Sequence, residues 1–251
     1  MSSSQHGGSP DRDLQDSKAL VTGATSGIGR AIAVQLAREG ADVVVHGRDA
    51  ARGADTVETI TAAGGRARFV PADLSDPADI GRLARDVGDI DVLVNNAGFS
   101  VFGATADLAA DRFDALYASN VRAPFFLVAA FAPRIAARGS GSIINVSSMA
   151  GQVGLPGGAA YGATKGAIES MTRAWAAEFS PSGVRVNAIA AGPVYTGGAV
   201  RERTEALGKT TPLNRAADAR EIAEAVGFLA SPRASYITGA IVAVDGGRAA
   251  I

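Results

Sequence analysis

The sequence of 251 residues has no cysteine and only two histidines, His6 and His46. Without cysteine there can be no disulfide bond, no thiolate nucleophile and no metal site with sulfur ligands. Because the sequence also lacks a cluster of other ligand residues, a metal enzyme is disfavoured and no bound metal is expected. A serine hydrolase is disfavoured as well, since neither histidine has a G-x-S-x-G motif nearby.

An excess of charge is also missing, because 24 Lys and Arg residues balance 25 Asp and Glu residues to a net charge of −1. We therefore expect no nucleic-acid partner and no attraction to a membrane surface. No apolar run, uninterrupted by charge or glycine, looks long enough to span a bilayer. Residues 1–13 lack the basic start and apolar core of a signal peptide, and their Ser, Gly and Asp content predicts a disordered tail. These absences favour a soluble cytoplasmic protein.

Short apolar runs alternate along the chain with longer segments of helical periodicity. The predicted strands are 19–21, 42–46, 68–70, 91–95, 142–146, 184–189 and 240–244. The predicted helices are 28–38, 49–62, 76–86, 111–138 (one helix or two), 160–179 and 219–230. This alternation predicts an α/β fold, namely a single-domain doubly wound Rossmann fold over residues 14–251, with a mainly parallel sheet of about seven strands and helices on both faces. Ligands of such folds bind beyond the carboxyl ends of the strands.

A glycine-rich turn with the sequence TGATSGIG follows the first predicted strand, at residues 22–29. Glycines let a backbone approach a pyrophosphate closely, and the helix that begins near Ile28 offers free N–H groups and the positive end of its dipole. The spacing is G-x-x-x-G-x-G rather than G-x-G-x-x-G, and by itself it is also compatible with an ordinary strand-to-helix connection. A P-loop is disfavoured because Gly29 is followed by Arg30 and Ala31.

Tyr161 and Lys165 lie four residues apart on a predicted helix and therefore share one face. The lysine charge should lower the pKa of Tyr161 and make it a general acid/base for an alcohol or carbonyl oxygen. The alternative is a chance pair on a solvated face. Ser148 follows the strand at 142–146, where its hydroxyl can hydrogen-bond a substrate oxygen, and Ser147 is an adjacent competitor.

Together these motifs resemble the short-chain dehydrogenase/reductase family, over residues 18–247. The resemblance selects Ser148 over Ser147 as the catalytic serine. It adds Asn120 as a fourth catalytic position, at which the asparagine kinks a helix and helps to hold a water leading to the lysine. The catalytic residues that the resemblance implies are Asn120, Ser148, Tyr161 and Lys165.

The same resemblance implies where the cofactor is held. The residues are Gly23, Thr25, Ser26, Gly27, Ile28 and Gly29 in the turn, Asp73 and Leu74 after the third strand, Asn95, Ala97 and Gly98 after the fourth, Tyr161 and Lys165 in the catalytic helix, and Val194 and Thr196 after the sixth strand. In the family the last segment holds the nicotinamide carboxamide. Members usually carry a proline immediately before Gly192, whereas this chain has Ala191.

The residues after the second strand bear on the choice of cofactor. Gly47 stands where NAD-preferring relatives carry an acidic residue that binds the ribose, and Arg48 follows it. A guanidinium suits a phosphate, so NADP(H) is favoured, with Ser26 as a second phosphate contact. NAD(H) remains an alternative because Asp49 lies one residue further on. His46 either reaches the adenine or has no role.

The expected function is hydride transfer between NADP(H) and a ketone or secondary alcohol, with Tyr161 as general acid/base. The alternatives are an NAD-dependent alcohol or sugar-acid dehydrogenase with the same site, and a nucleotide-binding sensor without catalysis. The chain is similar to 3-oxoacyl-thioester reductases and gluconate-type dehydrogenases, but no arginine cluster marks a carboxylate site. Residues 197–211 are expected to form a lid. The pocket is expected to be lined by Phe99, Met149, Val153, Leu155 and Tyr195.

The resemblance also implies a homotetramer, assembled through the helix that carries Tyr161 and the long helix before it. The apolar residues of 125–131 and 168–175 are compatible with such contacts, and equally with burial inside one chain.

Overall fold

The computed structural model describes residues 13–197 and 201–251. Within these ranges seven strands form one parallel sheet in the order β3-β2-β1-β4-β5-β6-β9. From edge to edge they are β3 (Arg66–Pro71), β2 (Asp42–Gly47), β1 (Lys18–Val21), β4 (Val92–Asn95), β5 (Gly141–Ser148), β6 (Val184–Ala191) and β9 (Ile241–Val244). A separate ladder joins β7 (Val194–Tyr195) to β8 (Ala217–Asp218). The prediction of a doubly wound fold with about seven parallel strands is confirmed.

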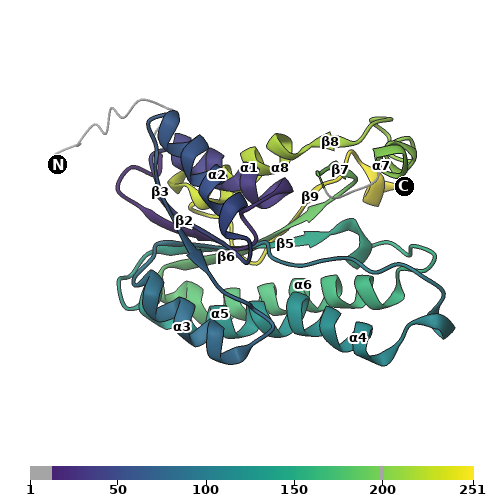
Figure 1. The fold of residues 1–251 in the computed structure, drawn as a ribbon, viewed down its shortest axis with the longest axis horizontal. Helices are drawn as coiled ribbons and strands as arrows, with labels where there is room; N and C mark the ends of the chain where they lie inside the picture. Colours follow the sequence, from purple (N-terminus) through teal and green to yellow (C-terminus); the bar gives the residue numbers. More distant parts are fainter. Residues whose placement is uncertain (1–12, 198–200) are drawn as a thin grey trace.

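Helices cover both faces of the sheet, as Figure 1 shows. One layer contains α1 (Gly27–Arg38), α2 (Ala50–Ala62) and α8 (Ala219–Ala230). The opposite layer contains α3 (Pro77–Val87), α4 (Ala110–Tyr117), α5 (Ala123–Ala136) and α6 (Ala159–Phe179). Helix α7 (Arg201–Gly208) lies beyond the carboxyl ends of the strands. Single 3₁₀ turns occur at Thr105–Asp107, Met149–Gly151, Ser180–Ser182, Pro232–Ala234 and Arg248–Ala250.

The central strands are apolar throughout because each contributes to two cores. In β1, Ala19 and Val21 pack with the layer of α1 and α8, whereas Leu20 packs with the layer of α3 and α5. All three side chains are fully buried. Successive residues of a strand point to opposite faces, so a sheet covered on both sides requires an uninterrupted apolar run.

The predicted helix at 111–138 is one helical run with a change of geometry. Helices α4 and α5 are joined by a turn of π-helix, Ala118–Arg122, which contains Asn120. Within the run Ala110–Ala136, one window of 18 residues has a mean hydropathy of 1.3, which by length and composition suffices for a membrane span. The run is interrupted by Arg112, Arg122 and Arg134, so it is not the uninterrupted apolar stretch that the sequence analysis looked for. A helix buried in a protein core meets the same measure, and 44% of the relevant window is buried, so the run is weak evidence for a span.

Two other expectations concern segments that the structure describes only in part. Residues 197–211 showed no strong pattern, yet α7 occupies Arg201–Gly208, while residues 198–200 lie outside the described part of the chain. Residues 1–12 of the predicted tail lie outside it too, whereas Asp13 lies within it and its carboxylate pairs with Arg233 at 2.6 Å.

The strand order fixes where a ligand can bind. Strand β1 is flanked by β2 and β4, and the chain winds outward in opposite directions from this point. Because the two crossover helices leave on opposite faces, a crevice opens beyond the carboxyl ends of β1 and β4. The glycine-rich turn and the NNAG segment both begin there.

Candidate active site

The glycine-rich turn between β1 and α1 uses conformations and spacings that side chains do not allow. Gly23 and Gly27 have φ values of 64° and 53°, in the left-handed region that favours glycine. A Cβ on Gly29 would overlap the carbonyl oxygen of Gly23 and the side-chain nitrogen of Asn96. The turn is therefore lined by backbone at the N-terminus of α1, which is the arrangement that binds phosphates.

The turn is joined to the end of β4 by Thr22 and Asn96. Thr22 Oγ1 accepts hydrogen bonds from the backbone N–H groups of Asn96 and Ala97, each at 3.0 Å, and the Asn96 side chain donates to the Thr22 carbonyl at 2.9 Å. Asn95 instead points into the sheet, where its side chain donates to Asn145 Oδ1 at 2.9 Å. Sequence reasoning selected Asn95 and missed Asn96, because adjacent identical residues differ only in the face to which they point.

His46 connects the same turn to the end of β3. Its Nδ1 accepts from the Gly23 N–H at 3.3 Å, and its Nε2 donates to the Ala72 carbonyl at 3.2 Å. The side chain is 2% exposed, and burial lowers its pKa to about 4. A neutral imidazole therefore has a structural role here and does not reach outward toward an adenine.

At the end of β2, three consecutive residues have different environments. A Cβ on Gly47 would overlap the methyl group of Thr25, so this position requires glycine. Arg48 is exposed. Asp49 is the N-cap of α2 and accepts from the Arg52 N–H at 3.0 Å and from Arg52 Nε at 2.9 Å, and these hydrogen bonds lower the pKa of its carboxyl. The acid that made NAD(H) an alternative is therefore used within the helix.

Asp73 and Leu74 follow β3 beside Arg48. Asp73 Oδ1 accepts from the Ser75 N–H at 3.0 Å and from its hydroxyl at 2.8 Å. These hydrogen bonds lower the pKa of Asp73, and the charge of Arg48 lowers it further. Leu74 is 7% exposed and packs into the core of the sheet, so its side chain contributes to the fold.

Tyr161, Ser148 and Lys165 come together between the end of β5 and the start of α6. The Tyr161 and Ser148 side chains are hydrogen-bonded. Lys165 Nζ lies 5.7 Å from the centre of the Tyr161 ring and donates to the Val146 carbonyl at 2.9 Å. The sequence spacing thus places a hydroxyl pair and an amine within one small region, beyond the same sheet edge as the glycine-rich turn.

The electrostatics of this group differ from the expectation. Burial raises the pKa of Tyr161, although its hydrogen bond with Ser148 acts in the opposite direction. Burial also lowers the pKa of Lys165 to about 8, against the attraction of Glu169. The prediction that Lys165 lowers the pKa of Tyr161 is wrong for this geometry, because desolvation dominates and the amine is directed at the Val146 carbonyl.

The side chains of Ser147 and Ser148 point to opposite faces of the sheet, because successive residues of β5 alternate between the faces. Ser147 is buried, and its hydroxyl donates to Glu169 Oε1 at 2.8 Å on the adjacent helix. Ser148 points the other way, to Tyr161. Glu169 is itself only 6% exposed and lies one helical turn beyond Lys165. Sequence reasoning did not single out this buried carboxylate, since nothing in the local pattern distinguishes it from a surface glutamate.

Asn120, in the π-helical turn, holds the segment after β4. Its Oδ1 accepts from the Phe99 N–H at 3.1 Å, and its Nδ2 donates to the Phe99 carbonyl at 2.9 Å and to Thr164 Oγ1 at 3.2 Å. A Cβ on Gly98 would come within 2.7 Å of Asn120 Oδ1. Asn120 therefore fixes the NNAG segment against α6, the helix that carries Tyr161 and Lys165.

The segment after β6 approaches the glycine-rich turn from the other side. The Thr196 side chain lies 3.3 Å from the place that a Cβ on Gly27 would take. The strand ladder runs through Ala191, and a Cβ on Gly192 would come within 2.6 Å of Asp245 Cα. The close approach thus depends on Gly192, and the segment keeps its strand geometry with alanine in place of the usual proline.

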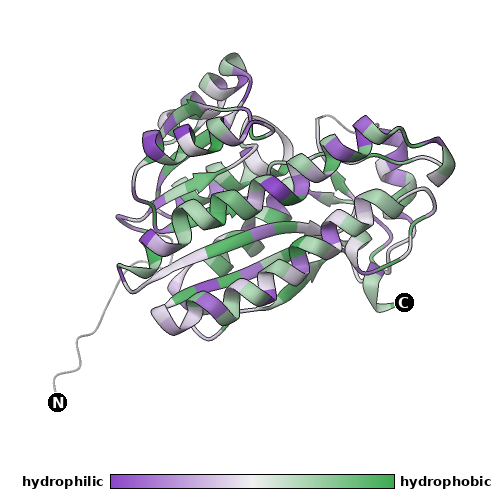
Figure 2. Cartoon of the chain, turned by 90° about the horizontal axis from the view of Figure 1, so that it is seen from below, coloured by the Kyte–Doolittle hydropathy of each residue, from purple (hydrophilic) through white to green (hydrophobic). Residues whose placement is uncertain are grey.

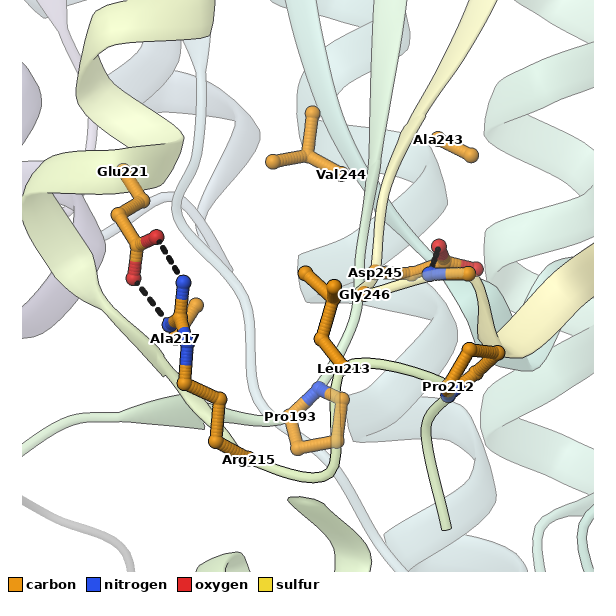
Figure 3. A pocket seen from close by; sticks show the side chains of 11 residues that line it. Pro193, Pro212, Leu213, Arg215, Ala217, Glu221, Ala243, Val244, Asp245 and Gly246 are labelled. Atoms are coloured by element: carbon orange, nitrogen blue, oxygen red, sulfur yellow. Dashed lines mark hydrogen bonds and ion pairs between the residues drawn. The ribbon is translucent and has the colours of Figure 1, made fainter. Parts of the chain in front are cut away.

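A cavity of about 420 Å³ lies behind this segment, lined by Pro193, Leu213 and the residues after β9 (Figure 3). Its one arginine, Arg215, lies opposite Glu221, and two hydrogen bonds of 2.7 and 2.8 Å join the guanidinium to the carboxylate. The cation is thereby paired within the fold, and Asp245, which also lines the cavity, accepts hydrogen bonds from the backbone N–H groups of Gly247 and Ala249.

The residues expected to line a substrate pocket differ in how exposed their side chains are. Met149 is buried, Phe99 is 38% exposed, and Val153, Leu155 and Tyr195 are half-buried. Phe102 and Arg203 were not anticipated. The Phe102 ring lies 5.6 Å from the Tyr161 ring, and the Arg203 guanidinium lies 4.8 Å from the Phe102 ring. These contacts link segments far apart in the sequence, which no local pattern reveals.

The fold and the backbone cradle at its crevice define a dinucleotide-dependent oxidoreductase, because the glycines leave room for a pyrophosphate beside a hydroxyl pair able to exchange a proton with a substrate. The family model described as enoyl-(acyl carrier protein) reductase matches residues 23–249. The chain belongs to the short-chain dehydrogenase/reductase family, and it is an NAD(P)-dependent enzyme that acts on alcohols or ketones.

Individual relatives cover almost the whole chain. Gluconate 5-dehydrogenase of Gluconobacter oxydans is 35% identical over 243 residues, which are 93% of this chain and 95% of the relative. The 3-oxoacyl-[acyl-carrier-protein] reductase of Staphylococcus aureus is 37% identical over 237 residues, 91% and 96% of the two chains.

Two solved structures also match almost the whole chain. A short-chain dehydrogenase/reductase family protein has 49% identity and a TM-score of 0.89, covering 95% of this chain and 100% of its own. A candidate NAD(P)-dependent gluconate 5-dehydrogenase from Beutenbergia cavernae, with bound NADP at low occupancy, has 37% identity and a TM-score of 0.91, covering 97% and 100%.

Proposed function

We propose that this chain transfers a hydride between NADP(H) and a small ketone or secondary alcohol, with Tyr161 as the general acid/base. The observation that carries the proposal is the grouping of Tyr161, Ser148 and Lys165 beyond the sheet edge at which the glycine cradle lies. When bound, the nicotinamide supplies the hydride in the direction of reduction.

The protein's own residues act on the substrate oxygen. In reduction, the Tyr161 hydroxyl donates its proton to the carbonyl oxygen, and the Ser148 hydroxyl donates a hydrogen bond to the same oxygen as negative charge develops there. The raised pKa of Tyr161 keeps it protonated and thus ready to act as an acid. Lys165 provides positive charge and holds the ribose, and Asn120 positions the segment at Phe99 and supports the proton relay.

The cofactor assignment rests on three residues at the end of β2. Gly47 has no room for a side chain, Asp49 is used as a helix cap, and Arg48 is exposed beside Asp73. An exposed guanidinium, next to an aspartate that is bound as a helix cap, favours a ribose phosphate, with Ser26 as a further contact. The neighbour from Beutenbergia cavernae with bound NADP supports this preference. NAD(H) with an alcohol or sugar acid is the second candidate, favoured by the likeness to gluconate 5-dehydrogenase.

We also propose a cytoplasmic homotetramer. The layer of α4, α5 and α6 exposes Phe113, Phe125 and Phe126, with 40 to 46% of each residue accessible. In Figure 2 the outer helices of this layer carry hydrophobic as well as hydrophilic segments. Aromatic side chains on an outer helix face are typical of subunit contacts. Light scattering on the purified chain and on the Phe125→Glu, Phe126→Glu variant tests this, because a tetramer should dissociate in the variant.

The catalytic proposal is tested by NADPH oxidation with a panel of small ketones, comparing the chain with its Tyr161→Phe variant. Loss of the acid should lower kcat by about 10² to 10⁴-fold without weakening NADPH binding. The matched control is Tyr236→Phe, because Tyr236 is fully exposed at the far end of the sheet. Equal rates for Tyr161→Phe and the unaltered chain would remove Tyr161 from catalysis. NADPH binding without turnover of any carbonyl compound would favour the nucleotide-binding sensor.

A further inference from the structure

Helix α7 brings a cation close to the reacting tyrosine through a stack of aromatic contacts. The guanidinium carbon of Arg203 lies 4.8 Å from the centre of the Phe102 ring, and that ring lies 5.6 Å from the Tyr161 ring. The cation and the proposed acid/base thus contact the same phenyl ring. A guanidinium stacked on an aromatic face keeps the N–H groups at its edge available for a second partner.

The Phe102 ring is held in place by the loops on either side of it. The Gly103 N–H donates to the Gly157 carbonyl at 3.0 Å, joining the loop after β4 to the loop before α6. A Cβ on Gly158 would lie 3.2 Å from the edge of the Phe102 ring, so the ring rests on the first turn of α6. Arg203 therefore stacks on a fixed platform beside Tyr161.

Arg203 also differs from neighbouring arginines in its partners. Arg201 pairs with Glu205 at 3.0 Å, and Arg215 pairs with Glu221 at 2.7 Å. Among residues 13–197 and 201–251, no carboxylate lies within ion-pair distance of Arg203. An unpaired guanidinium on an aromatic platform is suited to an anionic group of a ligand.

We propose that the substrate carries a carboxylate and that Arg203 binds it, while the reacting carbon lies at Tyr161. The inference rests on the proposed function, since it names the class of ketone or alcohol that the same site accepts. The planar fork of Arg203 matches a carboxylate in two parallel hydrogen bonds. The shared Phe102 ring, 4.8 Å from the guanidinium carbon and 5.6 Å from the Tyr161 ring, keeps that carboxylate within the span of a short carbon chain from the reacting oxygen. Because the group lies on α7, substrate binding also fixes this helix over the site.

The test compares a keto acid with its neutral ester. NADPH-dependent reduction of levulinate and of methyl levulinate is measured for the chain and for its Arg203→Ala and Arg203→Lys variants. The unaltered chain should favour levulinate, and Arg203→Ala should raise KM for levulinate about tenfold or more, with little change for the ester. Arg203→Lys should recover only part of the loss, since an ammonium provides no planar fork. Lys209→Ala is the control, because it removes one positive charge just after α7 without an aromatic contact.

Calorimetric titration of levulinate into the complex with NADP⁺ provides a readout that is independent of turnover. Tighter binding of levulinate than of its ester, lost in Arg203→Ala and kept in Lys209→Ala, supports the proposal. Equal effects of Arg203→Ala on acid and ester, or no effect on either, overturn it. These outcomes leave the role of Tyr161 untouched, whereas an unchanged rate in Tyr161→Phe contradicts the proposed function and leaves the calorimetric result standing.

Discussion

The carboxylate of Asp49 is bound by Arg52 at the first turn of α2, with 3.0 Å to its backbone nitrogen and 2.9 Å to its Nε. An N-cap aspartate satisfies a helix N–H that would otherwise lack a partner, which is worth about 1 kcal/mol. Turning Asp49 toward a ribose would cost this interaction. The cap therefore leaves Arg48 as the charged residue at the end of β2 that is available to a cofactor.

Arg48→Ala should weaken NADPH binding about tenfold and leave NADH binding nearly unchanged, because only NADPH carries the phosphate that a guanidinium binds. Fluorescence titration with each cofactor measures both dissociation constants. Arg52→Ala is the matched control, since it removes a nearby positive charge that is already paired with Asp49. A similar loss with Arg52→Ala, or tighter NADH than NADPH binding in the unaltered chain, would contradict the assignment of Arg48.

Gly29→Ala should abolish detectable binding of either cofactor. The added methyl group would overlap the Gly23 carbonyl and the Asn96 side chain, so the turn must move. Gly81→Ala makes the same change within α3, where the nearest atom is a flexible Arg85 side chain at 3.6 Å, and it should stabilise the fold by about 0.5–1 kcal/mol. Cofactor titration and urea unfolding distinguish the two variants. Cofactor binding by Gly29→Ala at the original affinity would show that the turn is not the pyrophosphate site.

His46 should make folding sensitive to mild acid. Its pKa is about 4 in the folded chain because of burial, against an unfolded value of 6.5. Below pH 6.5 the unfolded chain therefore binds a proton that the folded chain refuses, so stability falls as the pH drops from 6.5 toward 4, by at most about 3 kcal/mol. His46→Gln keeps an acceptor for the Gly23 N–H and does not titrate, so urea unfolding between pH 7 and 5 should show a smaller loss. Parallel pH curves for both proteins would refute this account.

The parts of the fold that could be predicted are those that depend on the residue types within one short segment of the sequence. The apolar run at 42–46 and the glycines of the first turn are legible because a strand covered on both faces and a tight backbone turn each demand particular residue types. Tyr161 and Lys165 were found because helical spacing alone puts them on one face. Their electrostatics were not predictable, since the pKa of Tyr161 depends on how deeply α6 buries it against β5.

What sequence reasoning missed depends on contacts between distant segments. Asn96 and Asn95 are indistinguishable in sequence, but the register of β4 turns one to Thr22 and the other to Asn145. Helix α7 has no apolar periodicity because most of it faces outward. Arg203 becomes a candidate binding residue only once the fold brings α7 to Phe102. Such positions are fixed by the tertiary fold, in which residues a hundred positions apart become neighbours.

Glu169 should act through Lys165 rather than on the substrate. Its carboxylate is buried one turn beyond the lysine, accepts from Ser147 at 2.8 Å, and raises the pKa of Lys165 against the larger opposing effect of burial. If the positive charge of Lys165 is needed, kcat/KM should fall as the pH rises through about 8, where this amine loses its proton. Glu169→Gln removes the attraction, so the same decline should begin at lower pH.

The pH profile separates this role from a merely structural one. A general loss of stability in Glu169→Gln would lower kcat/KM at every pH and leave the midpoint of the decline in place. Ser147→Ala is the matched control, because it deletes the hydrogen bond to Glu169 but leaves the carboxylate charge beside Lys165. Its midpoint should stay close to that of the unaltered chain. If Glu169→Gln and Ser147→Ala behave alike, the buried carboxylate serves packing, and burial alone determines the protonation of Lys165.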